Sequence, residues 1–253
     1  MRQNILKYII TAGLAIGCTL PATTQQTARE ILQKSLDLVN GNSNTATLRM
    51  SIVRPSWRRD MEIKSWSLGT EYSLILITSP ARDKGTAFLK REDELWNWQP
   101  RIERSIKLPP SMMLQAWMGS DFTNDDLVRQ SSIVEDYQHE IIGEESIEGR
   151  PCHIIELVPL PDAPVVWGKV ITWIDKDEYL TLKSEFYDEE GYVVSTMYGK
   201  EIKMLDGRLL PSVMEVVPAD EEGQKTVIEY LDIAFDVDIP ASFFSVQNMK
   251  RIK

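Results

Sequence analysis

The sequence predicts a mainly β (α+β) protein: a single, highly curved antiparallel sheet that forms a half-open β-barrel. Two observations predict it. After residue 44 most of the chain alternates apolar and polar residues with a period of two, and turn-forming residues separate the alternating segments at nearly regular spacing. Because a twisted sheet of about a dozen strands does not stay flat, it is expected to curl. An N-terminal helix and a central helical insert are then available to lid the concave face.

The N-terminal helix is expected at residues 27–39, where apolar residues recur at three- and four-residue spacing and Asn40-Gly41 ends the pattern. Its apolar positions are Ala28, Ile31, Leu32, Leu36 and Val39.

The expected strands fall into two groups on either side of the insert. They lie at residues 47–53, 57–66, 71–78, 86–90 and 94–98, and then at 133–142, 152–158, 169–174, 180–187, 192–202, 209–217 and 224–235. Short turns between them are typical of an up-and-down meander and not of βαβ units. The insert covers residues 108–130, where Pro109-Pro110 breaks the alternation and Thr123 is expected to cap a short helix together with Asp126.

The first 22 residues are typical of a secretory signal peptide. Arg2 and Lys7 precede the apolar run at residues 8–20, which is too short to span a bilayer, and small residues follow it. Two cleavage sites stay open. Cleavage after Ala22 would leave residues 23–253 as the mature domain in the periplasm, whereas a permissive lipobox ending at Cys18 would anchor the protein through a lipid.

The charge excludes some partners. The chain has 28 Lys and Arg against 38 Asp and Glu, a net charge of −10, which argues against binding nucleic acid. Hydrophobic residues make up 43% of the chain, enough apolar mass to close a core. Once the leader is removed, Cys152 is the one cysteine certain to remain, so no internal disulfide is expected.

Several motifs resemble the bacterial outer membrane lipoprotein-sorting protein family, which is LolA-like and similar in fold to the LolA, LolB and LppX carriers. These motifs are WSLGT at 66–70, PARDKGT at 80–86, LWNW at 95–98, IKLPPSMM at 106–113, WMGSDFTNDDL at 117–127 and FFSVQNMKR at 243–251. The resemblance covers essentially all of the mature chain.

The resemblance implies transport and no catalysis. It implies a periplasmic carrier that binds an acyl chain, lipid or lipoprotein in a hydrophobic cavity and hands it between envelope components. An inner-membrane permease or an outer-membrane acceptor is the implied partner. The alternative is a non-transporting envelope sensor or interaction module of the same fold that works with an inner-membrane export permease.

The candidate ligand-binding residues are apolar side chains of the insert and of the strands. Met-rich surfaces adapt to irregular partners, which favours the insert residues Met112, Met113, Trp117, Met118 and Phe122. The strand candidates are Leu74, Leu76, Trp96, Trp98, Trp173 and Met214. Ordinary core packing is the competing interpretation for every one of them.

No catalytic, cofactor or metal site is expected. His139 and His153 are the two histidines, and Cys152 and His153 are strand neighbours that should point to opposite faces. The acidic group Asp121, Asp125 and Asp126 lacks the spacing of a calcium loop. Helix capping explains these aspartates more simply.

Overall fold

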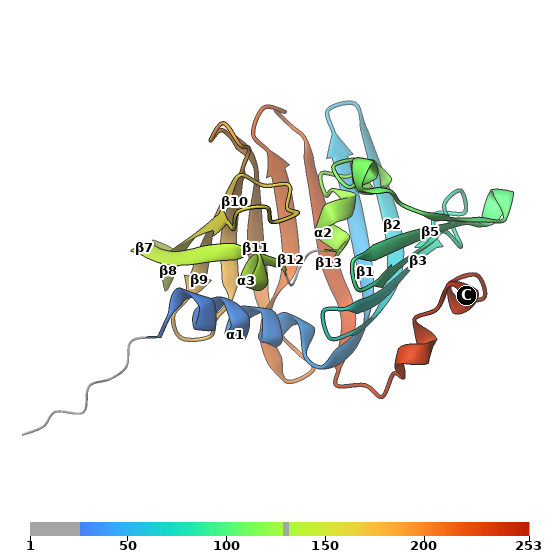
Figure 1. The fold of residues 1–253 in the computed structure, drawn as a ribbon, viewed down its shortest axis with the longest axis horizontal. Coiled ribbons are helices and arrows are strands. Elements are labelled where there is room, and N and C mark those ends of the chain that lie inside the picture. Colours follow the sequence, from blue (N-terminus) through green and yellow to red (C-terminus); the bar gives the residue numbers. More distant parts are fainter. Residues whose placement is uncertain (1–25, 129–131, 253) are drawn as a thin grey trace, which may run out of the picture.

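The computed structural model describes residues 26–128 and 132–252. It contains one curved antiparallel sheet of 13 strands, and β6 and β7 form its two unpaired edges (Figure 1). The predicted half-open β-barrel is therefore confirmed. The strands are β1 (Ser43–Arg54), β2 (Trp57–Leu68), β3 (Tyr72–Ser79), β4 (Ala87–Arg91), β5 (Glu94–Gln99), β6 (Arg104–Lys107), β7 (Tyr137–Ile147), β8 (Arg150–Pro159), β9 (Lys169–Asp175), β10 (Thr181–Tyr187), β11 (Val193–Leu205), β12 (Arg208–Pro218) and β13 (Lys225–Phe235).

The strand order joins two meanders back to back. Strands β1 to β6 run outward in one direction, strands β13 to β7 run outward in the other, and β1 pairs with β13 at the centre. The chain between β6 and β7 must therefore travel from one edge of the sheet to the other. This connection is the central insert, and its crossing places it over the inner face.

The insert contains the 3-10 turns η2 (Pro110–Met112) and η3 (Trp117–Gly119) and two short helices, α2 (Asn124–Val128) and α3 (Ser132–Glu135). Helix α2 begins as predicted, because the Thr123 hydroxyl accepts from the Asp126 N–H and the Asp126 carboxylate accepts from the Thr123 N–H. The strand predicted at 133–142 is partly wrong. Its first residues form α3, and β7 begins at Tyr137 and continues to Ile147.

Helix α1 (Ala28–Asn40) crosses the inner face of the sheet. It starts with a capping box between Thr27 and Glu30, as the apolar periodicity and this Thr-x-x-Glu pattern require. At its other end Arg208 donates to the carbonyl oxygens of Asp37 (3.0 Å) and Leu38 (3.1 Å), and the Gly41 N–H also donates to Asp37 at 2.9 Å. Both ends of α1 are thus fixed.

The two halves of the inner face are filled differently. Over β1 to β5 the insert packs down on the sheet, and Leu108 and Trp117 join a core that contains Met50, Ile63 and Phe88. Over β7 to β10 helix α1 takes that place. Its residues Ala28, Ile31 and Leu32 pack against Tyr137, Ile155, Leu157, Val170 and Ile174.

The C-terminal segment covers the outer face of β2 to β5. It includes η4 (Ala241–Phe243) and α4 (Val246–Met249) and lies beside these strands in Figure 1. Phe244 and Met249 are fully buried there against Leu74 and Leu76. Strand β3 is therefore buried on both faces, as its unbroken apolar run predicts. The remaining 3-10 turn, η1 (Pro100–Ile102), links β5 to β6.

Candidate functional site

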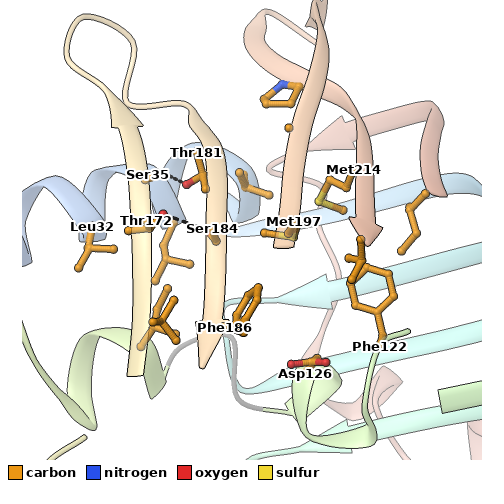
Figure 2. A pocket seen from close by; sticks show the side chains of 18 of the residues that line it. Leu32, Ser35, Phe122, Asp126, Thr172, Thr181, Ser184, Phe186, Met197 and Met214 are labelled. Carbon is orange, nitrogen blue, oxygen red and sulfur yellow. Dashed lines mark hydrogen bonds between the residues drawn. The ribbon is translucent and has the colours of Figure 1, made fainter. Parts of the chain in front are cut away.

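A cavity of about 320 Å³ lies on the inner side of strands β9 to β13, between α1 and the insert (Figure 2). Its walls are formed by α1, by the insert and by the strands from β7 to β13. Helix α1 contributes Leu32, Ser35, Leu36, Leu38, Val39 and Asn40. The insert contributes Trp117, Asp121, Phe122, Asp125, Asp126 and Ile133. The remaining lining residues are Tyr137, Leu157, Trp167, Val170, Thr172, Leu180, Thr181, Ser184, Phe186, Ser195, Met197, Gly199, Leu210, Pro211, Met214, Val216, Ile228 and Tyr230.

The cavity wall is mostly apolar, and four of its hydroxyl groups form two hydrogen-bonded pairs. The hydroxyl oxygens of Ser35 on α1 and Thr181 on β10 are 2.8 Å apart. Those of Thr172 and Ser184, on the neighbouring strands β9 and β10, are 3.0 Å apart (Figure 2). In each pair one hydroxyl donates to the other, which satisfies one donor and one acceptor site of the pair within the protein. This part of the wall is suited to apolar chains.

Gly199 shows how closely the wall strands pack. A Cβ atom at this position would lie 2.4 Å from the carbonyl oxygen of Thr181. Only glycine lets β11 and β10 approach each other here.

The insert is fixed to the sheet by a buried ion pair. Arg54 of β1 donates to both carboxylate oxygens of Asp121, at 2.9 and 3.1 Å, and the Thr226 hydroxyl donates to Asp121 at 2.7 Å. Arg59 of β2 donates to the carbonyl oxygen of Met118. These contacts hold the start of the cavity's cover against the centre of the sheet.

Asp126 is a buried carboxyl group of the cavity wall whose pKa is raised. Burial raises its pKa, and hydrogen bonds from the Thr123 N–H, the Thr123 hydroxyl and the Trp167 indole oppose this rise. The Trp167 ring in turn packs on Phe186, with ring centroids 5.2 Å apart. Asp126 therefore joins the insert to the strand side of the cavity.

Three of the predicted ligand-binding residues line this cavity: Trp117, Phe122 and Met214. Met113 and Met118 pack on the core over β1 to β5 instead. Met112 is half-buried in η2, and its carbonyl oxygen accepts from the Asn124 side chain. A role of these residues in binding stays a prediction.

The five other predicted residues, like Met112, Met113 and Met118, do not line this cavity. Leu74, Leu76, Trp96 and Trp98 pack beneath the C-terminal segment on the outer face of the sheet. Trp173 packs against Cys152 and Leu182, and its indole N–H donates to Glu145 at 2.6 Å. Period-two spacing groups such residues on one face, but it does not say which face is concave. Where both faces of a strand are apolar, the sequence offers no means to choose.

Sequence reasoning missed much of the wall, including Leu32, Trp167, Phe186, Met197 and Tyr230. The sequence contained part of the information needed to find them, namely the alternation of residues along each strand. Met197 and Ser195 alternate with outward residues on β11, as do Ser184 and Phe186 on β10. What the sequence lacked was the pairing partner of each strand, which decides whether the alternating set faces α1 or solvent.

The groups that could suggest catalysis, Cys152, His153 and His139, have the following surroundings. Cys152 is buried, and burial raises the pKa of its thiol, which disfavours the reactive thiolate. Burial lowers the pKa of His153. His139 lies 2.6 Å from the carbonyl oxygen of Ile133 through its Nε2 atom. Among residues 26–128 and 132–252, no three His, Cys, Asp or Glu side chains gather as a metal site would require.

Solved structures share this architecture over nearly the whole chain. A DUF1329 family protein from Desulfovibrio piger aligns with a TM-score of 0.80 and 24% identity, covering 89% of this chain and 100% of that one. An outer membrane lipoprotein-sorting protein domain from Vibrio parahaemolyticus aligns with a TM-score of 0.77 and 24% identity. The alignment covers 88% of this chain and 98% of that one. A LolA superfamily protein from Nitrosomonas europaea aligns with a TM-score of 0.76 and 24% identity. The alignment covers 88% of this chain and 99% of that one. At this identity the likeness establishes the fold.

The open sheet, its inner helices and these alignments define the chain as a protein of the LolA-like fold class, as the sequence motifs predicted. A family model whose description reads "-like: Uncharacterized protein" matches residues 69–251, and the chain belongs to that family. No curated protein matches the chain. None of the helices in the described part of the chain has the length and apolar character needed to cross a bilayer.

Proposed function

We propose that the protein is a carrier of the bacterial cell envelope. It binds an acyl chain, lipid or lipoprotein in the cavity between α1 and the insert, and it passes this cargo between envelope components. The single observation that carries the proposal is the cavity itself: an apolar hollow remains between a sheet and two covering elements that otherwise pack tightly. Protein interiors contain few voids larger than a water molecule, so a hollow of this size supports a binding role.

Burial of a chain supplies the affinity. Each methylene group removed from water contributes about 0.8 kcal/mol, so a chain of about a dozen carbons supplies micromolar binding after the costs of ordering. The cargo must then be released by another component. An inner-membrane permease or an outer-membrane acceptor is the partner that this mechanism requires.

Export fits the same proposal. Residues 1–22 serve as the leader and residues 23–253 as the mature carrier domain in the periplasm. Both cleavage sites considered above lie outside the described residues. The proposed role is non-catalytic, and the raised thiol pKa of Cys152 and the lowered pKa of His153 are compatible with it.

The alternative function, an envelope sensor or interaction module without cargo, needs no open interior. The hollow favours the carrier. Native mass spectrometry of protein extracted from the envelope separates the two. A carrier arrives with bound amphiphile, and a consistently ligand-free chain supports the sensor.

A pair of variants on one strand tests the site. Met197 lines the cavity, whereas its neighbour Tyr198 points to the outer face, where the Lys200 ammonium lies 5.3 Å from its ring. Met197→Trp fills the hollow and is expected to weaken binding of a fluorescent dodecanoyl probe at least tenfold. Tyr198→Trp is expected to leave binding unchanged. Equal binding by both variants and the wild type would remove the cavity as the cargo site.

A further inference from the structure

The sign of the charge changes along one end of the sheet. The β1–β2, β3–β4 and β5–β6 connections lie at this end, and with the strand ends beside them they form the basic patch, residues 54–59, 80–86 and 99–104. The patch contains seven basic and two acidic residues, in a chain whose net charge is −10. The β10–β11 and β12–β13 turns lie at the same end and contain the acidic runs 188–190 and 220–222.

The three parts of the basic patch are continuous with each other and with the insert. Burial lowers the pKa of Arg59, and the nearby Asp83 carboxylate opposes this change, so the first two parts are neighbours. A Cβ atom on Gly85 would lie 3.4 Å from the ring of Pro100, which joins the second part to the third. Arg59 also donates to the carbonyl oxygen of Met118. The patch therefore borders the segment that begins the cavity's cover.

The basic side chains of the patch face solvent. Lys84, Arg101 and Arg104 are exposed, and within the described part of the chain none of them has a carboxylate at ion-pair distance. Arg58 and Arg82 are also exposed, although each is paired with one carboxylate. Clustered cations of this kind create a positive potential that attracts anions.

Apolar side chains lie among these cations. Trp57 is 48% exposed and Ile102 is 59% exposed, and the Arg54 guanidinium lies 5.8 Å from the centre of the Trp57 ring. Tryptophan and basic side chains together are typical of protein surfaces that contact the interfacial layer of an anionic bilayer. An acidic protein would match the charge alone, whereas a bilayer matches both the charge and the exposed ring.

We propose that the basic patch docks the protein on an anionic phospholipid bilayer. Lys84, Arg101 and Arg104 bind the phosphate groups, and Trp57 and Ile102 enter the interfacial layer. The acidic turns at the same end are repelled, so the protein meets the bilayer on its β1–β6 side. This docking goes beyond the proposed carriage of cargo, and it brings the start of the cavity's cover to the lipid surface.

Vesicle co-sedimentation tests the proposal on residues 23–253. The probes are vesicles of phosphatidylcholine alone and vesicles of equal parts phosphatidylcholine and phosphatidylglycerol. Each basic side chain near an anionic surface contributes about fivefold to binding, so the anionic vesicles should bind at least about tenfold more tightly. Binding should weaken as salt is raised from about 50 mM to about 500 mM, because salt screens such contacts.

Two triple variants with the same change in net charge locate the contact. The patch variant removes three unpaired cations: Lys84→Gln, Arg101→Gln and Arg104→Gln. The control variant removes three exposed cations elsewhere on the surface: Lys64→Gln, Arg91→Gln and Arg251→Gln. The patch variant should lose at least about tenfold in binding to anionic vesicles, and the control should lose clearly less. Retained binding of the fluorescent dodecanoyl probe shows that each variant is folded.

A second pair of variants tests the aromatic contact. Trp57→Ala should reduce the binding that remains at high salt, because that part comes from insertion of the ring. Tyr192→Ala is its control, since Tyr192 is 72% exposed on the acidic β10–β11 turn of the same end. It should leave vesicle binding unchanged.

Equal losses in the two triple variants would mean that overall charge drives binding, and would overturn the proposal. Equal binding of wild-type protein to both kinds of vesicle, or binding to neither, would overturn it too. If wild-type protein binds no vesicle but binds polyglutamate, and the patch variant does not, the partner is an acidic protein and the lipid proposal is wrong. The dodecanoyl probe reports on the cavity in every case, so the carrier function is tested separately.

Discussion

Arg54 and Asp121 form a two-pronged ion pair that is almost completely shielded from solvent, with 14% and 9% of their side chains exposed. The pair connects the central strand β1 to the insert that crosses from one edge of the sheet to the other. Because charge-assisted bonds with this geometry are strong and specific, the pair fixes the position of the cavity's cover.

Removing one member of this pair should be costly. Asp121→Ala leaves Arg54 buried without its counter-charge and is expected to destabilise the protein by about 3–5 kcal/mol in urea unfolding. The double variant with Arg54→Met should recover part of this loss. Lys203→Ala, which breaks an exposed pair with Glu201, should change little. If Asp121→Ala were as stable as Lys203→Ala, the insert would not depend on the ion pair.

The pH dependence of stability should reveal Asp126. Its pKa is raised in the folded state by burial, so the folded protein binds this proton more tightly than the unfolded chain. Its contribution therefore becomes unfavourable as pH rises above the ordinary value of about 3.9 and through the raised pKa. Asp126→Asn keeps an oxygen to accept from Thr123 and should be more stable than wild type at pH 7. The advantage should shrink as pH falls toward 4, measured by thermal unfolding.

Asp60 should affect the pH dependence of stability in the opposite direction, because its pKa is lowered in the folded protein. A hydrogen bond from Ser51 lowers its pKa, and Arg58 adds to this effect. Its stabilisation is therefore present above the ordinary pKa and is lost as pH falls through the lowered value. Asp60→Asn should be less stable than wild type at pH 7, with the difference closing on acidification. If Asp126→Asn and Asp60→Asn both raised, or both lowered, the stability at pH 7, these assignments would be wrong.

The C-terminal segment should contribute a large share of stability through Phe244, which is fully buried against Leu74 and Leu76. Phe244→Ala is expected to cost about 3–5 kcal/mol, because it leaves a cavity in a packed layer. Phe243 lies beside it but is only half-buried, so Phe243→Ala should cost clearly less. Denaturant titration of both variants measures the difference, and equal losses would mean that the segment packs differently.

The mature N-terminus should identify the export route. Cleavage after Ala22 predicts an intact mass that begins at Thr23, together with recovery in the periplasmic fraction. Cys18→Ala should then change neither result. Two results would instead establish the lipid-anchored form. The intact mass would begin at Cys18 and include acyl chains, and the Cys18→Ala protein would move from the membrane fraction to the soluble fraction.

The parts of the fold that depend on neighbouring residues could be predicted from the sequence. The amphipathic periodicity placed α1 almost to the residue, and the Thr123–Asp126 cap formed as expected. Two elements differ from the prediction: β6 (Arg104–Lys107) was not expected, and the strand expected at 133–142 begins later. Ile133 and Val134 continue the β-like texture, but Val134 is buried against α1 as part of α3. Packing overrode local propensity there.

The candidate site was less predictable because it depends on distant contacts. Leu74 and Ile75 are equally apolar neighbours on β3, and only the docking of Phe244 on one side and the insert on the other assigns their faces. Likewise, Met214 and Met197 meet in the cavity only after β12 and β11 pair. A pattern along one strand contains no information on either event.

The central pairing of β1 with β13 has a consequence for how the chain reaches its native state. The last strand to be synthesised is the one that unites the sheet, since until β13 arrives β1 and β12 belong to separate half-sheets. Contacts between sequence positions so far apart are slow to form. The two half-sheets can therefore join only once β13 has paired with both β1 and β12, and a chain truncated before residue 225 would lack the strand that joins them.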